Sequence, residues 1–432
     1  MSRNDYVALI TIGALIAVVV ATIVFWLAGS ESMLVSGLGA SIAIAFGRLA
    51  GLALMLLVFC QVLLASRMPL LDAFPSFSAP RMHRLCGFSI LGMIVIHVCL
   101  LVGGYAARDH RGVFEQCSVF ITTWDNVVYA LVGAVVILAI GIMSIRAVRT
   151  LFRYELWYAF HLFLYGAIAF SFMHQISSGD MADSLARTYW TTLALLVGCV
   201  FLWYRVFRPL WYVVWHDFRI ARVVRESDTV VSIYITGRHM RSFRFKAGQY
   251  AHFMFLQRGL CSHHPFSFSQ PYNGIDLRVS IKKLGDFTNT IENLVPGTRV
   301  IIDGPMGHFT CNLAETGRFC FVAGGIGITP IVAMIRDLAR PADAVAFVAN
   351  KMRSDTPLIH ELMHAGVQVH TYVSDVTPAQ KIDASEIIKT CPDVFDRDVF
   401  LCGPPGMVIG ITNELVAAGV PTRHIHSEGF SY

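Results

Sequence analysis

Charged residues are scarce in this 432-residue chain: only 15% of the residues are Asp, Glu, Lys or Arg, whereas 55% are hydrophobic. An average soluble domain has about 25% charged and about 45–50% apolar residues, so a chain that is soluble throughout is excluded. Lysine is absent before Lys246, and every other lysine follows it. The chain has no long basic run and a modest net charge of +5, which argues against nucleic acid as a partner. These absences divide the chain into a membrane half and a water-soluble half.

The ten cysteines lack the paired spacing that is typical of metal centres. No two of them form a Cys-x-x-Cys motif, which argues against zinc and iron–sulfur sites. Cysteines within the apolar runs are interpreted as small core residues. Cys117 is the one that we place on the outer side of the membrane, where a single cysteine has no partner for an intrachain disulfide.

Six apolar stretches have about the length of a bilayer-spanning helix, which needs about 20 residues. Arginines gather around the second and fourth connections and after the last stretch, so the positive-inside rule places both chain ends in the cytoplasm. We therefore expect an integral protein of the cell membrane, a bacterial inner membrane, with its C-terminal half in the cytoplasm. The six stretches are 6–28, 47–65, 83–103, 127–145, 156–173 and 190–206.

Four histidines lie in these stretches or directly at the end of one, where ionisable side chains are costly and are functional by default. His83 and His97 are 14 residues apart, so on an ideal helix they lie within about 40° of one face and about 21 Å apart along the axis. His161 and His174 in the fifth stretch offer each of them a partner at the same depth. Two haems with bis-histidine ligation, stacked across the membrane, use all four side chains. Hydrogen-bonded or interfacial histidines are the alternative, and spacing alone does not distinguish haem from copper.

The 13-residue spacing of His161 and His174 is less regular, because an ideal helix points these side chains about 140° apart. We therefore expect a local helix irregularity near Gly166. Arg48 is predicted to lie at the outer end of the second stretch, at the depth of the outer histidine pair. It is either a snorkelling interfacial arginine or a cation beside the outer haem that pairs with a propionate or attracts an anionic product.

From about residue 218 the pattern changes to short alternating runs, which predict a small antiparallel barrel. After about residue 316, apolar strands alternate with helices, which predicts a parallel α/β sheet. The fold class is therefore a six-helix all-α transmembrane bundle followed by a barrel and an α/β domain, with predicted domain ranges of 1–216, 217–314 and 315–432. The predicted strands are 230–236, 250–256, 277–282, 299–303, 318–323, 344–349, 367–373 and 398–402, and the predicted helices are 330–339, 358–365 and one from about 405.

An apolar strand, a glycine-rich turn and a helix start follow one another in the segment FVAGGIGITP at 321–330. Gly324, Gly325 and Gly327 let the backbone approach a pyrophosphate, which then meets the amide groups of the following helix. A tight turn without a ligand is the alternative. Three further segments favour a nucleotide site: a Pro-fixed extended stretch, a second helix start and the end of the last strand. They are HPFS at 264–267, GDFT at 285–288 and LCGPP at 401–405.

In this order and at these distances, the four segments resemble the ferredoxin–NADP reductase superfamily. Joined to a six-span bundle with two histidine pairs, the whole chain resembles the ferric reductase and NADPH oxidase family and is most similar to the short prokaryotic NADPH oxidases. The resemblance implies a ferredoxin–NADP reductase-like module, with FAD in the antiparallel β-barrel and the nucleotide in the α/β domain. It also implies two b-type haems with bis-histidine ligation, and NADPH or NADH as the electron donor.

The resemblance further implies roles for individual residues. The four histidines match the haem ligands, and Arg48 matches an arginine beside the outer haem. Phe430 matches a terminal ring that stacks on isoalloxazine and moves aside for nicotinamide, with Tyr432 as a weaker candidate. The FAD-binding positions are His264, Pro265, Phe266, Ser267, Gly285, Asp286, Phe287 and Thr288. The nucleotide loop contains Gly325, Gly327, Thr329 and Pro330, and the motif beside the nicotinamide contains Cys402, Gly403 and Pro404.

The sequence thus predicts an NAD(P)H oxidase that passes electrons from cytoplasmic NAD(P)H through FAD and two haems to an external acceptor. Oxygen, reduced to superoxide, is the first choice of acceptor, and a ferric chelate is the second. Leu101 stands where animal oxidases have a further histidine, and this departure keeps ferric reduction open.

Two readings from other classes compete with the oxidase. One is a membrane electron carrier that reduces a protein or quinone partner, although nothing in the sequence requires a protein partner. The other, a transporter with a flavin regulatory domain, is disfavoured because the spans show no inverted repeats. Lys351 and Arg353 follow a predicted strand and favour NADPH if they pair with its 2′-phosphate, whereas solvated loop residues are the alternative.

Overall fold

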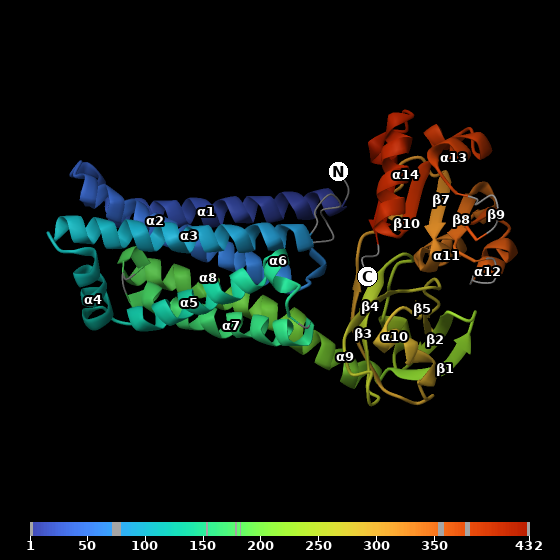
Figure 1. Cartoon of the computed structure of the whole chain (residues 1–432), viewed down its shortest axis with the longest axis horizontal. Helices are drawn as coiled ribbons and strands as arrows, with labels where there is room; N and C mark the ends of the chain where they lie inside the picture. Colours follow the sequence, from blue (N-terminus) through green and yellow to red (C-terminus); the bar gives the residue numbers. More distant parts are fainter. Residues whose placement is uncertain are drawn as a thin grey trace. The chain divides into compact units, whose positions relative to one another are not determined.

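The computed structural model describes residues 3–70, 79–152, 154–177, 179–181, 183–352, 358–375 and 381–429. The chain forms two compact units, Met1–Val206 and Phe207–Tyr432. The first consists of helices, and the second of two groups of strands with shorter helices (Figure 1).

Every predicted apolar stretch falls on a helix of the first unit. Five helical segments are long and apolar enough to cross a membrane, and the fifth of them continues α8 as far as His216. The remaining stretch is α5, which is shorter and forms a bent pair with α4 at 115°. The helices are α1 (Arg3–Val35), α2 (Gly39–Ala65), α3 (Ala79–Arg108), α4 (Val113–Thr123), α5 (Val127–Met143), α6 (Arg146–Arg149), α7 (Tyr154–Ser177) and α8 (Ser184–Leu202). The prediction of an N-terminal region of apolar spanning helices is confirmed.

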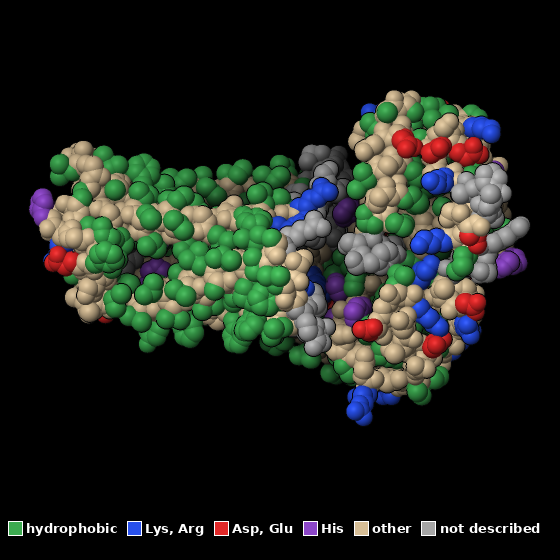
Figure 2. All heavy atoms as spheres, viewed as in Figure 1, with side chains coloured by type: hydrophobic (Ala, Val, Ile, Leu, Met, Phe, Trp, Pro, Cys, Tyr) green, Lys and Arg blue, Asp and Glu red, His purple; other side chains and the backbone are tan. Residues whose placement is uncertain are grey.

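Small residues allow the helices of this unit to pack closely. A Cβ atom added to Gly51 of α2 would lie 2.6 Å from the ring of His97 on α3. One added to Gly133 of α5 would lie 2.1 Å from the hydroxyl of Ser171 on α7. Close approach through small residues is a common way for helices to associate where the surroundings are as apolar as the side chains. The outer surface of the unit is correspondingly covered by hydrophobic side chains (Figure 2).

The expected irregularity near Gly166 is wrong, because α7 is a regular α-helix from Tyr154 to Ser177. Rotation about the side-chain torsions of histidine moves its ring relative to the helix axis, so a break in the helix is not required for the ring to reach a partner. A π-helical turn occurs instead at Trp203–Phe207, between α8 and α9 (Arg208–His216).

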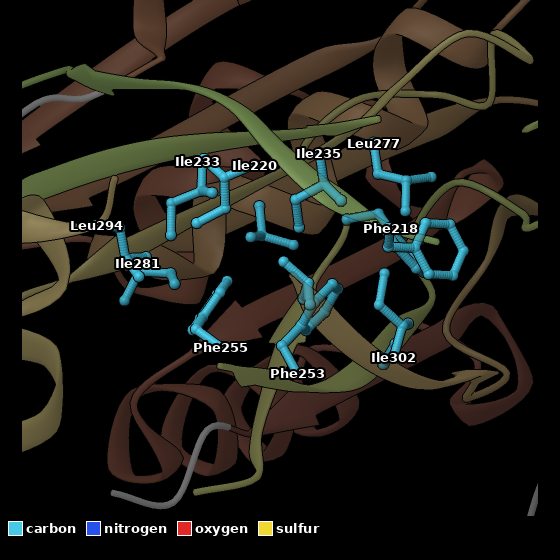
Figure 3. Close-up of a cluster of buried hydrophobic side chains, with 14 of the residues drawn as sticks. Phe218, Ile220, Ile233, Ile235, Phe253, Phe255, Leu277, Ile281, Leu294 and Ile302 are labelled. Carbon is cyan, nitrogen blue, oxygen red and sulfur yellow. The ribbon is translucent and has the colours of Figure 1, made fainter. Parts of the chain in front are cut away.

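The first part of the second unit is an antiparallel barrel made of two three-stranded sheets, with orders β1-β2-β5 and β4-β3-β6. Two isolated bridges, Arg219 with Arg299 and Phe268 with Val279, connect the sheets. Alternating side chains of these strands fill a common core of aliphatic and phenylalanine residues (Figure 3). The strands are β1 (Arg219–Arg225), β2 (Val230–Thr236), β3 (Tyr250–Phe255), β4 (His264–Ser267), β5 (Leu277–Lys282) and β6 (Val300–Met306).

The second part is a parallel five-stranded sheet with the order β11-β10-β7-β8-β9. Alternate residues of β7 face opposite sides: Phe321 and Ala323 pack with α11, whereas Cys320 and Val322 pack with α13 and α14. The strand order reverses between β7 and β10, and such a switch point is where open α/β sheets bind ligands. The elements are β7 (Phe319–Gly324), α11 (Ile328–Asp337), β8 (Val345–Asn350), α12 (Ile359–His364), β9 (Gln368–Val373), α13 (Ala384–Thr390), β10 (Asp398–Gly403), α14 (Pro405–Ala417) and β11 (Ile425–Gly429).

Candidate functional site

The outer histidine pair lines one cavity of the helical unit. His97 on α3 and His174 on α7 both border a cavity of about 320 Å3. Nδ1 of His97 lies 2.8 Å from the carbonyl oxygen of Gly47, and Nδ1 of His174 lies 2.5 Å from that of Ser171. Because a carbonyl oxygen only accepts, Nδ1 donates in each case, and Nε2 of each ring keeps its lone pair. This orientation is the usual one for a histidine that ligates a metal through Nε2.

The inner histidine pair is assembled from the same two helices. The ring centroids of His83 on α3 and His161 on α7 are 6.3 Å apart. An iron bound about 2 Å from one nitrogen of each ring requires a centroid separation of about 6 Å. Nδ1 of His161 is buried and has no hydrogen-bond partner among the described residues.

The residues present therefore fit two bis-histidine haems. Among the described residues, no group of three or more His, Cys, Asp or Glu side chains is placed to hold a metal ion. Such a group is the signature of a zinc or carboxylate site, whereas a bis-histidine haem takes only two ligands from the protein. The geometry of the two pairs is the relevant observation, and it supports the predicted ligands His83, His97, His161 and His174.

Arg48 on α2 lies at the same cavity and is held by two partners. Its Nη1 donates to Oδ1 of Asp180 at 2.9 Å, and its Nη2 donates to the hydroxyl of Tyr105 at 3.2 Å. Tyr105 packs edge-on against Phe120 and Trp124, with centroid distances of 5.4 and 5.3 Å. Arg48 is therefore fixed beside the outer histidine pair and is not a free snorkelling side chain.

The predicted flavin segments meet on the barrel. His264 on β4 and Phe287 on the short helix α10 (Asp286–Asn289) have ring centroids 3.8 Å apart, and Nε2 of His264 lies 2.9 Å from the hydroxyl of Ser262. Burial lowers the pKa of His264, which favours its neutral imidazole. Phe266 packs against the core beside Phe287. The two segments HPFS and GDFT thus form one surface of rings and backbone amides.

The hydroxyl of Thr288 closes the turn before α10. It accepts hydrogen bonds from the backbone N–H groups of Leu284 and Gly285, at 2.8 and 3.0 Å. The amide groups at the start of α10 are therefore held in one orientation. Gly285, Asp286 and Thr288 are placed in this turn, while Pro265 and Ser267 lie on β4 beside His264.

The glycine-rich turn after β7 touches the end of β10. Gly325 has φ of +54°, a conformation that glycine adopts without strain. A Cβ atom at Gly327 would lie 2.2 Å from the carbonyl oxygen of Cys402, and one at Gly403 would lie 3.0 Å from Gly324. Only hydrogen fits at these positions, so the two strand ends meet closely at the switch point of the sheet, where a ligand crevice is expected.

The remaining predicted nucleotide residues flank this crevice. The hydroxyl of Thr329 donates to the carbonyl of Ile326 at 2.9 Å, which closes the first turn before Pro330. Pro404 precedes α14 on the opposite side. Lys351 lies exposed after β8, whereas Arg353, Phe430 and Tyr432 lie outside the described residues.

Glu428 on β11 is the neighbour of Cys402 in the parallel pairing of β10 and β11. Its Oε2 atom is buried without a hydrogen-bond partner among the described residues. Burial raises the pKa of Glu428 to about 7. Burial also raises the pKa of the Cys402 thiol, and the neighbouring Glu428 raises it further. Burial thus favours the protonated form of Glu428, which lies next to Cys402 in the pairing of β10 and β11.

We expect the stability of the second unit to fall as the pH rises from about 4.5 to about 7. The folded-state pKa of Glu428 lies above its ordinary value of 4.5, so the stabilising contribution is fully present below that value and is lost as the buried carboxyl ionises. Glu428→Gln removes this part of the pH dependence. Thermal release of FAD fluorescence from the full chain at pH 5, 6, 7 and 8 measures the difference. Glu315→Gln, a change at an exposed carboxylate, should retain the wild-type profile, and an unchanged profile in Glu428→Gln would contradict the expectation.

Sequence reasoning missed Asp180 and Tyr105 as partners of Arg48. Asp180 lies in a three-residue 3-10 helix, Gly179–Met181, between α7 and α8. In the sequence, Asp180 is one acidic residue in a connection between two apolar stretches. Residues of such a connection carry no periodic signal that places them against a distant helix. An arginine predicted within an apolar span was the one available signal, since such a charge needs a partner.

Comparison with known proteins identifies two segments, one in each unit. Residues 46–172 match the ferric reductase-like transmembrane component, and residues 215–310 match an FAD-binding domain. A flavohemoprotein of Bacillus cereus is 27% identical over 249 residues, which cover 50% of this chain and 61% of that protein. The chain thus spans about three-fifths of the length of this relative.

Two solved structures are similar to half of this chain. One is a cytochrome P450 reductase of Amycolatopsis, with 18% identity, a TM-score of 0.45 and coverage of 50% of this chain and 70% of that one. The other is the FAD/NAD-binding domain of a nitric oxide dioxygenase from Vibrio cholerae, with 20% identity, a TM-score of 0.42 and coverage of 50% and 98%. The matched families show an integral membrane oxidoreductase, and a transmembrane component joined to a flavin-binding reductase module implies electron transfer across the membrane.

Proposed function

Because the chain has the domain arrangement of the ferric reductase and NADPH oxidase family, we propose that it carries electrons from cytoplasmic NADPH to oxygen on the outer side of the membrane. The product is superoxide. The observation that carries this proposal is the pairing of His83 with His161 and of His97 with His174 on two neighbouring helices. Its orientation follows the positive-inside rule, with the second unit on the cytoplasmic side of a bacterial inner membrane.

When bound, NADPH would donate a hydride to FAD, and FAD and the two haems would pass its two electrons on one at a time. The protein orders and separates these groups. The histidine pairs hold one group near each face of the bilayer, and the hydrogen bonds of His97 and His174 to backbone carbonyls keep their Nε2 atoms available. Apolar side chains around the outer pair exclude water from the cavity.

In the second unit, the glycine-rich turn beside Cys402 receives the nucleotide, and HPFS and GDFT receive the flavin. Glu428 holds or releases a proton beside the nicotinamide position, since its pKa of about 7 allows both states. Lys351, which is exposed after β8, pairs with the 2′-phosphate, which makes NADPH the preferred donor over NADH.

A ferric chelate is the second candidate for the acceptor. Leu101 lines the outer cavity, so this position offers neither a proton nor a hydrogen bond to reduced oxygen. Reduction of an iron chelate requires neither. Delivery of electrons to a quinone or protein partner requires the same path and predicts negligible oxygen turnover without that partner.

The proposal is tested with purified full-length protein in nanodiscs, supplied with FAD, haem and NADPH. We expect b-type bands in the reduced-minus-oxidised spectrum, and reduction of cytochrome c that superoxide dismutase suppresses by at least nine-tenths. Insensitivity to the dismutase together with fast ferric-citrate turnover would replace the oxidase by a ferric reductase. Absence of the b-type bands would overturn the electron path itself.

A further inference from the structure

The charged groups of the outer cavity balance one another. Among the described residues that line it, the fully charged side chains are Arg48 and Asp180. Nη1 of Arg48 and Oδ1 of Asp180 are 2.9 Å apart, and their side chains are 20% and 1% exposed. The remaining lining is mainly aliphatic and aromatic. An anion that approaches Arg48 therefore meets a cation whose charge is already neutralised by a neighbouring carboxylate.

Asp180 is held in place by its surroundings. A Cβ atom at Gly29 of α1 would lie 2.6 Å from its Oδ1, so glycine is needed for α1 to pack against the carboxylate. Its second oxygen, Oδ2, is buried, and the side chain of Ser30 on α1 lies near the carboxylate. Burying a carboxylate in an apolar cavity is costly unless it serves as a partner for a buried cation. The observed partner is Arg48.

Arg48 is fixed on its other side as well. Its Nη2 donates to the hydroxyl of Tyr105, and Tyr105 is itself packed by Phe120, Trp124 and the guanidinium of Arg108. Both terminal nitrogens of Arg48 already donate, one to Asp180 and one to Tyr105. An arginine binds the carboxylate group of a chelate most strongly with two parallel N–H donors, so such a ligand has to compete with Asp180 for the guanidinium.

We propose that Asp180 is a specificity-determining residue: by neutralising Arg48 it restricts the outer cavity to uncharged acceptors and excludes anionic ferric chelates. The inference rests on the proposed function and names the class of acceptor. An uncharged molecule such as dioxygen approaches the apolar side chains around Arg48 without losing an ionic hydration shell, while the space between His97 and His174 is the one assigned to the outer haem. A ferric citrate complex must lose its hydration and gains no unpaired cation in return. In Asp180→Asn, the size and shape are retained while Arg48 becomes a net positive charge.

The first test is binding without turnover. Full-length protein in nanodiscs is titrated by calorimetry with gallium(III) citrate, a redox-inert anion of the same shape as ferric citrate. Wild type should show no saturable binding of gallium citrate up to millimolar concentration. For Asp180→Asn we expect a Kd at least tenfold below the highest concentration at which wild type shows no binding. The double variant Arg48→Gln with Asp180→Asn should lose the gained binding. Saturable binding by wild type would overturn the proposal even if the variants fail to fold.

The second test is selectivity in turnover. The ratio of kcat/KM for ferric citrate to that for oxygen should rise at least tenfold in Asp180→Asn. The matched control is Asp183→Asn, which removes an exposed carboxylate from the same connection and keeps an asparagine cap on α8. An unchanged ratio in Asp180→Asn, or an equal rise in Asp183→Asn, contradicts the proposal. Lack of oxygen reduction in wild type with the gallium results intact would instead remove the oxidase function and leave the charge balance standing.

Discussion

His97→Leu is expected to halve the haem content of the purified protein and to lower reduction of external acceptors at least 100-fold. Nδ1 of His97 donates to the carbonyl of Gly47, which leaves Nε2 available to ligate the proposed outer haem. Leucine fills much of the same space and supplies no lone pair. Electrons then have no carrier at the outer depth, and tunnelling across the remaining apolar layer is too slow to replace it.

The same variant should keep its flavin chemistry. NADPH-dependent reduction of ferricyanide takes electrons at the flavin in the second unit, so this rate should remain within about twofold of the wild-type rate. Pyridine haemochrome analysis measures the haem, and dismutase-sensitive cytochrome c reduction measures the outer step. His110→Asn is the control, since His110 is an exposed outer residue with φ of 54°, which asparagine tolerates. Full haem content in His97→Leu would remove His97 from the ligand set.

Strands were predicted best from the sequence where their side chains are buried and the hydrophobic pattern is long enough to recognise. The predicted strands at 230–236 and 277–282 coincide with β2 and β5, because the two strands pair with each other and nearly every residue of both is buried. Strands β4 and β11 are four and five residues long, too short for a period to emerge. Strand β1 carries Arg219, Arg222 and Arg225 on a partly exposed edge, so its hydrophobic alternation is weak.

The candidate site divides in the same way. Four histidines in apolar spans are conspicuous, and helix geometry predicts two pairs. In the structure His83 lies beside His161, and His97 and His174 line one cavity, while their role as haem ligands stays a prediction. The same geometry wrongly predicted a helix irregularity near Gly166, because it ignores the rotation of side chains about their own torsions. Asp180 was not predictable, since its contact with Arg48 spans 132 residues and depends on how a short connection folds back between two helices.

Gly327→Ala is expected to lower the rate of flavin reduction by NADPH at least 100-fold while leaving FAD bound. The added methyl group would lie 2.2 Å from the carbonyl oxygen of Cys402 and 2.9 Å from Cα of Gly403. Both are backbone atoms at the end of a central strand, so neither can rotate away as a side chain would. The turn after β7 must move outward instead, and the crevice in which the nucleotide is expected to lie loses its shape.

Because the flavin segments lie on the barrel, FAD content and reduction of the flavin by dithionite should stay at wild-type levels. Stopped-flow measurement of flavin bleaching by NADPH without oxygen isolates the step that Gly327 affects. Gly410→Ala in α14 is the matched control, since a Cβ atom there meets nothing within 4 Å and alanine favours a helix by about 0.5–1 kcal/mol over glycine. If NADPH binds at the turn after β7, displacement of that backbone must slow flavin bleaching. Bleaching at the wild-type rate in Gly327→Ala would therefore mean that the nucleotide binds elsewhere.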